Sequence, residues 1–328
     1  MKEQAPRITA VIVNYRSAQL AIGCLESLND ERQREPGLRA MVVDNASDDG
    51  SAAAIAAAIS QSGWHDWVEL VISPVNGGFA HGNNQAIVRL ITDCAPNDLV
   101  WLLNPDTIVR PGAATVLANF MAAHPEAGIA GSLLIEADGA PWPYAFRFPS
   151  LLGELERGAR LRALSRWLSR YNILEKMGDQ PSRAQWVSGA SMVVRGAVFA
   201  DIGKMDDGYF LYFEETDFCL QAARAGWGCW YVPDAHVVHI AGQSTGLTGQ
   251  APTQKAMPGY WFESRRRYFI KNHGRSYAIA ADLFWTIGHI LRLARHRFRL
   301  PIDREPRERL TDFLSHSALF NRAERKTA

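Results

Sequence analysis

The chain has 328 residues, of which 47% are hydrophobic and 21% are charged. This length suits one large domain with an appendage or two small domains, and the composition excludes a disordered chain. The net charge of +1 is unevenly distributed, because residues 1–254 carry a balance of −8 and residues 255–328 a balance of +9. The basic C-terminal part predicts an anionic surface or a polyanion as a partner.

The first 110 residues alternate between short apolar runs and segments with helical spacing. Buried parallel strands are expected at 8–14, 40–43, 68–73 and 99–103. Helices are expected at 17–28, 51–59 and 83–91, the last preceded by a glycine-rich loop at 77–82. This alternation predicts an α/β domain with a mainly parallel central sheet flanked by helices.

The middle of the chain continues the α/β pattern with a basic insertion. Strands are expected at 128–135 and 188–194, and a helix at 151–176. The apolar face of this helix leaves two interpretations open, an ordinary surface helix or an insertion that faces an acceptor or a membrane. Further on, 277–294 is apolar but contains Asp282 and His289, which favours an interfacial helix over a membrane span.

The cysteines and the N-terminus indicate a cellular location. No Cys-x-x-Cys pair and no zinc-like Cys/His spacing occurs, so the cysteines are interpreted as reduced core residues in a cytosolic protein. The polar N-terminus has no basic-then-apolar signal pattern. The four cysteines are Cys24, Cys94, Cys219 and Cys229.

Polar or glycine residues follow the end of each of the first four expected strands. In open α/β sheets the carboxyl ends of the strands form the edge where ligands bind. Any one of these residues could be a turn former or a helix cap, but four such strand ends in succession favour a ligand site. The residues concerned include Asn14, Tyr15, Asp44, Asn76, Gly77, Gly78, Asn84, Asn104 and Asp106.

Two of these strand ends have specific chemistry. The segment NGGFAHGNN at 76–84 lets backbone approach a phosphate beside a helix N-terminus. It is neither a Walker loop nor a dinucleotide fingerprint, which argues against ATPases and nicotinamide enzymes. Asp106, in Asn104-Pro105-Asp106, could hold a divalent cation beside a diphosphate, or could cap a helix after a proline turn.

Acidic and histidine residues near the C-terminal half complete the candidate chemistry. Glu214, Glu215 and Asp217 lie among aromatic residues, which disfavour ionisation and so suit a general base, although a charged helix start is the ordinary alternative. His236 and His239 are expected to face opposite sides of a strand. One of the two could complete a metal site, or both could be structural.

Taken in chain order, eight segments resemble the family 2 glycosyltransferases with a GT-A fold, and in particular their rhamnosyltransferase-like branch. They are VIVNY, VVDNASDDGS, NGGFAHGNN, LLNPD, WVSGASMVVR, FLYFEETDFCLQAARAGW, VVHIAGQSTG and FESRRRYFIKNHG. The resemblance implies a catalytic domain over 1–274, with a nucleotide-binding part at about 1–110 and an acceptor part at about 111–274. A basic, amphipathic, helical extension over 275–328 follows as a C-terminal appendage.

The resemblance also implies a role for individual residues. It makes Asp106 and His239 ligands of Mg²⁺ or Mn²⁺. It makes Glu215 the catalytic base, with Asp217 as the alternative, because Glu215 stands where the family usually has aspartate. Asn104 replaces the first aspartate of the family's Asp-x-Asp element. Nucleotide-sugar binding is assigned to Asn14, Tyr15, Asp44, Asn76, Gly77, Gly78, Asn84, Asn104, Trp186 and Gly189.

The implied reaction is an inverting, metal-dependent sugar transfer from a nucleotide-diphosphate donor. The branch implies L-rhamnose from dTDP-L-rhamnose, and a saccharide or polyprenyl-diphosphate-linked glycan as acceptor in surface polysaccharide biosynthesis. Nucleic acid is not expected as a partner. We expect a loop at 243–259 to close over the donor, and the arginines at 265–267 to lie on a solvated face or to hold diphosphate.

The basic C-terminal region suggests that the protein works in the cytoplasm, on the inner face of the membrane, with a buried C-terminal helix as the open alternative. Two other functions fit the sequence less well. A sugar nucleotidyltransferase would have a glycine- and arginine-rich loop after its first strand, which residues 14–17 lack. A non-catalytic glycan-binding or nucleotide-sugar-binding protein would have no need of the set Asp106, Glu215 and His239.

Overall fold

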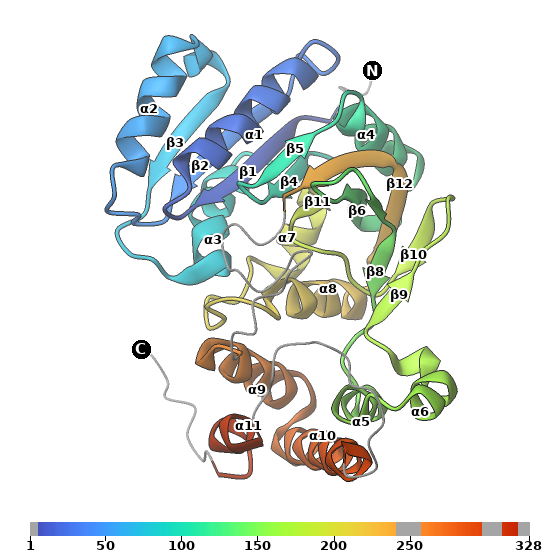
Figure 1. Cartoon of the computed structure of the whole chain (residues 1–328). Helices are drawn as coiled ribbons and strands as arrows, with labels where there is room; N and C mark the ends of the chain where they lie inside the picture. Colours follow the sequence, from blue (N-terminus) through green and yellow to red (C-terminus); the bar gives the residue numbers. More distant parts are fainter. Residues whose placement is uncertain (1–5, 241–256, 297–309, 321–328) are drawn as a thin grey trace. The chain divides into compact units, whose positions relative to one another are not determined.

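The computed structural model describes residues 6–240, 257–296 and 310–320 (Figure 1). The chain divides into two compact units. Unit 1 comprises Met1–Phe146, Lys176–Phe210 and Glu214–Thr245, and unit 2 comprises Arg147–Glu175, Leu211–Phe213 and Gly246–Ala328. Most of the loop predicted at 243–259 lies outside the described residues.

Unit 1 is built around a large mixed sheet. Its strands are β1 (Ile8–Asn14), β2 (Arg39–Asp44), β3 (Val68–Ile72), β4 (Leu99–Leu103), β5 (Thr107–Val109), β6 (Ala127–Ile135), β7 (Pro141–Trp142), β10 (Ser182–Ala184), β11 (Ser191–Arg195) and β12 (Gly228–His239). The main strand order is β10-β12-β6-β11-β4-β1-β2-β3, while β5 pairs with β12 and β7 with β6. The short strand β8 (Tyr144–Phe146) lies outside this sheet.

The predicted parallel arrangement of the first four strands is confirmed. Strands β3, β2, β1 and β4 are mutually parallel, and so are β6 and β12, whereas β11 is antiparallel to both of its neighbours. In the register of β1 with β2, Asn14 lies opposite Asp44. The polar strand ends are therefore gathered at one edge of the sheet, as the pattern of the sequence indicated.

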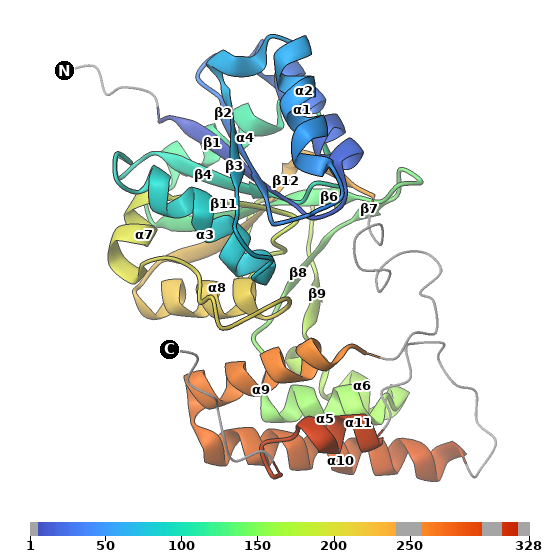
Figure 2. The same cartoon turned by 90° about the vertical axis from the view of Figure 1, so that its left-hand side faces the viewer.

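Helices cover both faces of this sheet. They are α1 (Ala18–Glu31), α2 (Ser51–Gln61), α3 (Gly78–Leu90), α4 (Ala113–Ala123), α7 (Gly196–Ile202) and α8 (Glu214–Arg224), with a short 3₁₀ helix η1 (Trp64–Asp66). Figure 2 shows α1 and α2 on one face and α3, α7 and α8 on the other. The main core packs Leu25 of α1, Ile55 of α2 and Leu117 of α4 against Ile12 and Trp101 of the sheet.

Helix α3 begins earlier than predicted, inside the segment expected to be a loop. Gly78 has φ +87° and is the first residue of the helix. A Cβ atom at this position would lie 1.7 Å from the carbonyl oxygen of Phe210, so only glycine fits here. The prediction of a loop was wrong because glycine carries a low intrinsic helix propensity, which tertiary packing overrides at this position.

Unit 2 is mainly helical. It contains α5 (Leu151–Ala159), α6 (Arg162–Trp167), the 3₁₀ helix η2 (Ser169–Tyr171), α9 (Gly259–His273), α10 (Arg275–His296) and α11 (Leu310–His316), and most of the short strand β9 (Leu174–Lys176). The single helix predicted at 151–176 is wrong, because α5 ends at Ala159 and the next residue, Arg160, has φ +46°. Left-handed backbone at a helix C-terminus cannot be continued as a right-handed helix.

Helices α5 and α10 pack backbone against backbone. A Cβ on Gly158 would lie 2.3 Å from the carbonyl oxygen of Trp285, and one on Gly288 would lie 2.4 Å from that of Leu155. Two glycines on facing helices therefore allow this close approach.

A buried arginine joins three helices of unit 2. Arg265 of α9 donates to Glu154 of α5 at 2.8 and 3.1 Å and to Asp282 of α10 at 2.6 Å. Its side chain is 4% exposed. The expectation that Arg265 lies on a solvated face or holds diphosphate was therefore wrong, because both of its carboxylate partners belong to the core of unit 2.

The compact units do not follow the expected boundary at residue 274, since 147–175 and 246–274 cluster with the C-terminal helices. The limits 1–274 and 275–328 remain a prediction about where the catalytic function ends. Helices α10 and α11 confirm the helical C-terminal appendage. Within the described ranges, no helix combines the length and the apolarity that crossing a membrane requires.

Candidate active site

Asn14 and Asp44, two predicted nucleotide-binding residues, are buried side by side at the ends of β1 and β2. The Nδ2 of Asn14 donates to Oδ1 of Asp44 at 2.8 Å. Ser47 donates its hydroxyl to the same oxygen at 2.6 Å and its backbone N–H to Oδ2 at 3.1 Å. The structure thus brings the two residues together, and their polar atoms shape the loop that follows β2.

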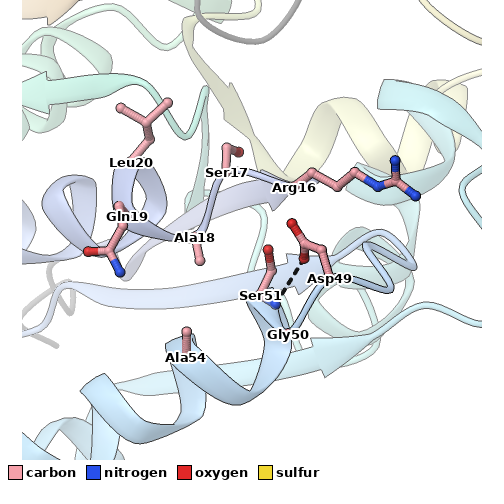
Figure 3. Close-up of a pocket in the computed structure, with 9 residues that line it drawn as sticks. All are labelled: Arg16, Ser17, Ala18, Gln19, Leu20, Asp49, Gly50, Ser51 and Ala54. Carbon is pink, nitrogen blue, oxygen red and sulfur yellow. Dashed lines mark hydrogen bonds between the residues drawn. The ribbon is translucent and has the colours of Figure 1, made fainter.

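A cavity of about 350 Å³ opens beside these strand ends (Figure 3). It is formed by the first turns of α1 and α2 and the loops that precede them, and neither helix has a side-chain N-cap hydrogen bond. Helix N-termini favour anionic groups, and that of α2 already has one, because Asp49 Oδ1 accepts from the N–H of Ser51 at 3.0 Å. No sequence pattern predicted this cavity, because its residues have the ordinary composition of turns. The lining residues are Arg16, Ser17, Ala18, Gln19, Leu20, Asp49, Gly50, Ser51 and Ala54.

Asn45 fixes the glycine segment to the end of β2. Its Nδ2 donates to Oδ1 of Asn76 at 3.0 Å and to the carbonyl oxygen of Gly78 at 3.0 Å. Asn76 Oδ1 also accepts from the N–H of Gly78 at 3.1 Å. A Cβ on Gly77 would lie 2.4 Å from the ring of His81. The sequence predicted Asn45, directly after Asp44, to lie on the ligand-binding edge, but it did not predict that Asn45 fixes the glycine segment.

Asn84 lies on α3 and is bound to a neighbouring segment of unit 1. Its Nδ2 donates to the carbonyl oxygen of Met205 at 2.8 Å, and its Oδ1 accepts from the N–H of the same residue at 3.1 Å. The Nδ2 also contacts the carboxylate of Asp207. The amide of Asn84 is therefore engaged within the protein, and its predicted contact with a nucleotide sugar stays a prediction.

Asp106 and His239 are brought together by the antiparallel pairing of β5 with β12, in which His239 lies opposite Thr107. The Nε2 of His239 lies 3.3 Å from Oδ1 of Asp106 and 3.2 Å from Nδ2 of Asn104. Asp106 is 2% exposed, and among the described residues its Oδ1 has no hydrogen-bond partner. His236 is exposed and lies beyond a register shift of β12.

The pair formed by Asp106 and His239 has the chemistry of a partial cation site. A buried carboxylate oxygen without a hydrogen bond is costly unless a cation or another donor satisfies it. Within the described ranges, no group of three His, Cys, Asp or Glu residues is arranged to hold a metal ion. These two side chains fit a hard divalent cation only if oxygen atoms of a ligand or water complete its coordination.

Glu215 lies in the first turn of α8; the residue as a whole is half-buried, and its Oε2 atom is shielded from solvent. Burial raises the pKa of its carboxyl group to about 7, against the opposing effect of the backbone N–H groups of Glu215 and Gly189. Its Oε2 has no hydrogen-bond partner among the described residues. Asp217, the alternative base, is also buried, and it accepts from Gln221 at 3.3 Å. A carboxylate with a pKa near neutrality suits general-base chemistry.

The segment 188–190 connects the two halves of the site. The backbone N–H of Asn104 donates to the carbonyl oxygen of Ala190 at 3.1 Å. A Cβ on Gly189 would lie 3.2 Å from the ring of Phe79 and 3.9 Å from Cβ of Glu215. Asn104, which contacts His239, and Glu215 therefore flank one short segment, although they are far apart in the sequence.

Two further predicted residues lie at the margins of these clusters. Trp186 stacks on Phe146, with ring centroids 4.0 Å apart, so one face of its indole is covered. Tyr15 is 41% exposed, and the guanidinium of Arg16 lies over its ring at 5.2 Å. Both aromatic residues thus have defined protein partners, and their contact with a sugar or a base remains a prediction.

A strained turn precedes Glu214 and Glu215. Tyr212 and Phe213 both have φ +69°, a conformation that bulky residues rarely adopt. The ring of Phe213 contacts those of Trp261 and Tyr268, with centroids 5.7 and 5.6 Å apart. These contacts hold the strained backbone in place, and such strain is often concentrated at functional sites. No sequence pattern predicted it.

Comparison with known sequences identifies relatives. The sequence model described as "Glycosyltransferase like family 2" matches residues 6–269. The chain is 30% identical over 218 residues to the N-acetylglucosaminyl-diphospho-decaprenol L-rhamnosyltransferase of Mycobacterium tuberculosis, covering 63% of this chain and 67% of the relative. It is 25% identical over 166 residues to rhamnosyltransferase WbbL of Escherichia coli, covering 50% of this chain and 61% of the relative.

Two solved structures share the fold. One is the mannosyltransferase PcManGT from Pyrobaculum calidifontis in complex with GDP-Man and Mn²⁺, with a TM-score of 0.54 and 16% identity over 91% of this chain and 77% of the other. The second is GalNAc-T7 with UDP, GalNAc and Mn²⁺, with a TM-score of 0.59 and 12% identity over 96% of this chain and 57% of the other. The predicted GT-A fold is confirmed by these likenesses.

Proposed function

The chain belongs to the glycosyltransferase-like family 2 and is a glycosyltransferase, and from this premise we propose that it transfers L-rhamnose from dTDP-L-rhamnose to a glycan acceptor with inversion. The observation that carries the reaction type is the position of Glu215. Its carboxyl group, whose pKa is about 7, lies beside Gly189 of the segment 188–190. Ala190, at the end of the same segment, binds the backbone of Asn104. Asn104 in turn contacts His239, which lies against Asp106. The choice of rhamnose rests on the two relatives.

Glu215 acts as the general base in this proposal. It removes the proton from an acceptor hydroxyl while the acceptor oxygen bonds to the anomeric carbon and the bond from that carbon to the diphosphate oxygen breaks. A single displacement of this kind inverts the anomeric configuration. The buried position of Glu215 raises its proton affinity, so that at neutral pH it can both lose and regain a proton.

Asp106 and His239 are the residues that would hold a divalent cation, Mg²⁺ or Mn²⁺, which when bound neutralises the charge of the leaving diphosphate. The buried Oδ1 of Asp106, which has no hydrogen-bond partner among the described residues, supports this assignment. The Mn²⁺ in the complexes of PcManGT and GalNAc-T7 supports it as well. The Nε2 of His239 has one lone pair, so a cation bound there would replace the present contact with Nδ2 of Asn104.

The nucleotide part of the donor is proposed to lie along the edge formed by β1, β2 and the glycine segment. Asn14 and Asp44 would act by shaping this edge, because their side chains are bonded to each other and to Ser47. Exposed Tyr15 is free of that constraint, whereas the N–H and the carbonyl oxygen of Gly78 are already bonded to Asn76 and Asn45. The adjacent cavity between α1 and α2 adds the N-terminus of α1, which favours negative charge, while the N-terminus of α2 already bonds the carboxylate of Asp49.

The acceptor is proposed to be a saccharide linked to a polyprenyl diphosphate, in surface polysaccharide biosynthesis on the inner face of the membrane. The name of the mycobacterial relative describes a lipid-linked acceptor of this kind. The balance of +9 over residues 255–328 suits work beside anionic lipid. Neither a sugar nucleotidyltransferase nor a non-catalytic binding protein fits the family.

The test is donor turnover with a panel of nucleotide sugars, Mg²⁺ or Mn²⁺ and a synthetic lipid-linked acceptor, measured as release of nucleoside diphosphate. We expect turnover to be highest with dTDP-L-rhamnose and to fall strongly in Asp106→Ala and Glu215→Gln variants. Glu69→Gln is the matched control, because Glu69 is half exposed and pairs with Arg89, which is about equally exposed. Undiminished turnover in both site variants would refute the assignment, and preference for another donor would refute rhamnose alone.

A further inference from the structure

Helix α10 has two apolar faces, and only one of them is covered by described parts of unit 2. The covered face includes Ala281 and Trp285, both almost completely buried, and Gly288, which touches α5. Figures 1 and 2 both show α5 and α9 on one side of α10. The other face carries large aliphatic side chains that are 44–53% exposed, namely Leu283, Ile287, Ile290, Leu291 and Leu293.

The exposed residues form one continuous stripe, which we call the α10 outer face. Their spacing of four, three, one and two residues places them on one side of an α-helix over three turns. The large exposed hydrophobic residues of unit 1 are instead spread over several elements, for example Ile72, Val88 and Ile108. Scattered exposed hydrophobic residues are ordinary, whereas a contiguous stripe marks an interaction surface.

The positive charge of unit 2 favours an anionic partner for this face. By sequence, unit 2 contains 22 Lys and Arg residues and 10 Asp and Glu residues, a balance of +12, while unit 1 has 13 and 24, a balance of −11. Arg292 lies within the same part of α10, and Arg295, Arg297 and Arg299 follow it in the sequence. An apolar helix face in a strongly basic unit matches an anionic bilayer surface, where acyl chains receive the apolar side chains and headgroups receive the arginines.

A second copy of the chain is a weaker match for the same face. A symmetric dimer would place one α10 outer face against another and bring together two units that each carry a balance of +12. Two positively charged units in contact repel each other, whereas anionic lipid attracts each of them.

We propose that the α10 outer face docks on the surface of an anionic phospholipid bilayer, with α10 lying in the plane of the interface. This inference rests on the proposed function only for the choice of a membrane-bound acceptor, and it names the surface that makes the contact. Because vesicle binding is measured without any sugar transfer, failure of the docking and failure of the reaction are distinguishable.

The experiment is co-sedimentation of the full chain with vesicles of phosphatidylcholine alone or mixed with phosphatidylglycerol. The test variant carries Ile287→Glu and Ile290→Glu. The control carries Val88→Glu and Ile91→Glu, which have the same spacing and lie at the exposed end of α3 in unit 1. Circular dichroism and thermal unfolding establish that both variants fold.

We expect the native chain and the control to bind the anionic vesicles, and the α10 variant to bind roughly tenfold more weakly or less, because two glutamates oppose both insertion and attraction to the headgroups. Turnover with a water-soluble acceptor should be the same in all three proteins. The proposal is overturned if the native chain ignores anionic vesicles, if it binds neutral vesicles equally well, or if the α10 variant binds as the native chain does. A dimer in solution that dissociates in the α10 variant would also overturn it.

Discussion

Replacing Glu215 by glutamine should stabilise the fold while it abolishes the reaction. Burial raises the pKa of this carboxyl group from 4.5 to about 7. The native fold therefore favours the protonated form, and its stability is unaffected by Glu215 below pH 4.5. As the pH rises from 4.5 to 7, the unfolded chain releases this proton more readily than the folded chain, so the free energy of unfolding falls. Above pH 7 the penalty is complete.

The size of this effect follows from the two pKa values. Their difference corresponds to roughly 3 kcal/mol of unfolding free energy at pH 8, as an upper estimate. Glutamine has nearly the same shape and carries no charge, so the variant should gain up to about this amount at pH 8 relative to pH 4.5. Turnover should fall by roughly 10²–10⁴-fold, because the proton acceptor is lost. In the native enzyme, kcat should rise with pH through about 7.

Urea unfolding followed by tryptophan fluorescence, at pH 4.5 and pH 8, measures the stability difference between the variant and the native chain. Donor turnover is measured on the same preparations. Glu69→Gln serves as control and should show almost no pH-dependent difference, because Glu69 is half exposed. A stability difference that is the same at both pH values would refute the burial argument, and retained turnover would refute the catalytic role.

Three further substitutions test other parts of the structure. Asp106→Asn should lower turnover and weaken the stabilisation of the protein by Mn²⁺ in thermal unfolding; unchanged Mn²⁺ stabilisation would contradict a role with His239 in holding the cation. Gly78→Ala should destabilise the fold by about 1–3 kcal/mol or more, because its φ is +87° and its Cβ would meet the carbonyl oxygen of Phe210; a neutral effect in urea unfolding would show that α3 can move. Arg265→Met should cost about 3–5 kcal/mol, since two buried carboxylates lose their partner; calorimetry that finds less than about 1 kcal/mol would show that these carboxylates are not held as charges.

The pattern of residues was sufficient to predict the first half of the sheet and its functional edge. The strand predicted at 8–14 is β1 with the same bounds, and the strand predicted at 99–103 is β4. These runs are continuous and apolar, and each is flanked by polar residues, so local pattern is sufficient to define them. Because the carboxyl ends of parallel strands share one edge, the neighbourhood of Asn14 and Asp44 followed directly.

The identity of the candidate ligands was also visible in the sequence, but their arrangement was not. The meeting of Asp106 with His239 depends on the pairing of β5 with β12, which are distant in the chain. The raised pKa of Glu215 depends on burial by the elements packed around it, which outweighs the backbone N–H of Gly189 from another segment. Sequence patterns report which residues are present, whereas desolvation is set by every element packed around them.

Where helices begin and which of their faces are covered depends on packing between elements that are distant in the chain. Gly78 starts a helix because its missing side chain leaves room for Phe210, and Arg265 is buried because two carboxylates on other helices receive it. Helix α10 was expected from its composition, but its apolar residues run all round the helix. The periodicity of apolar residues describes the surface of a single helix, while burial depends on the elements packed around it. The α10 outer face is therefore defined by α5 and α9, which cover the opposite side of the helix.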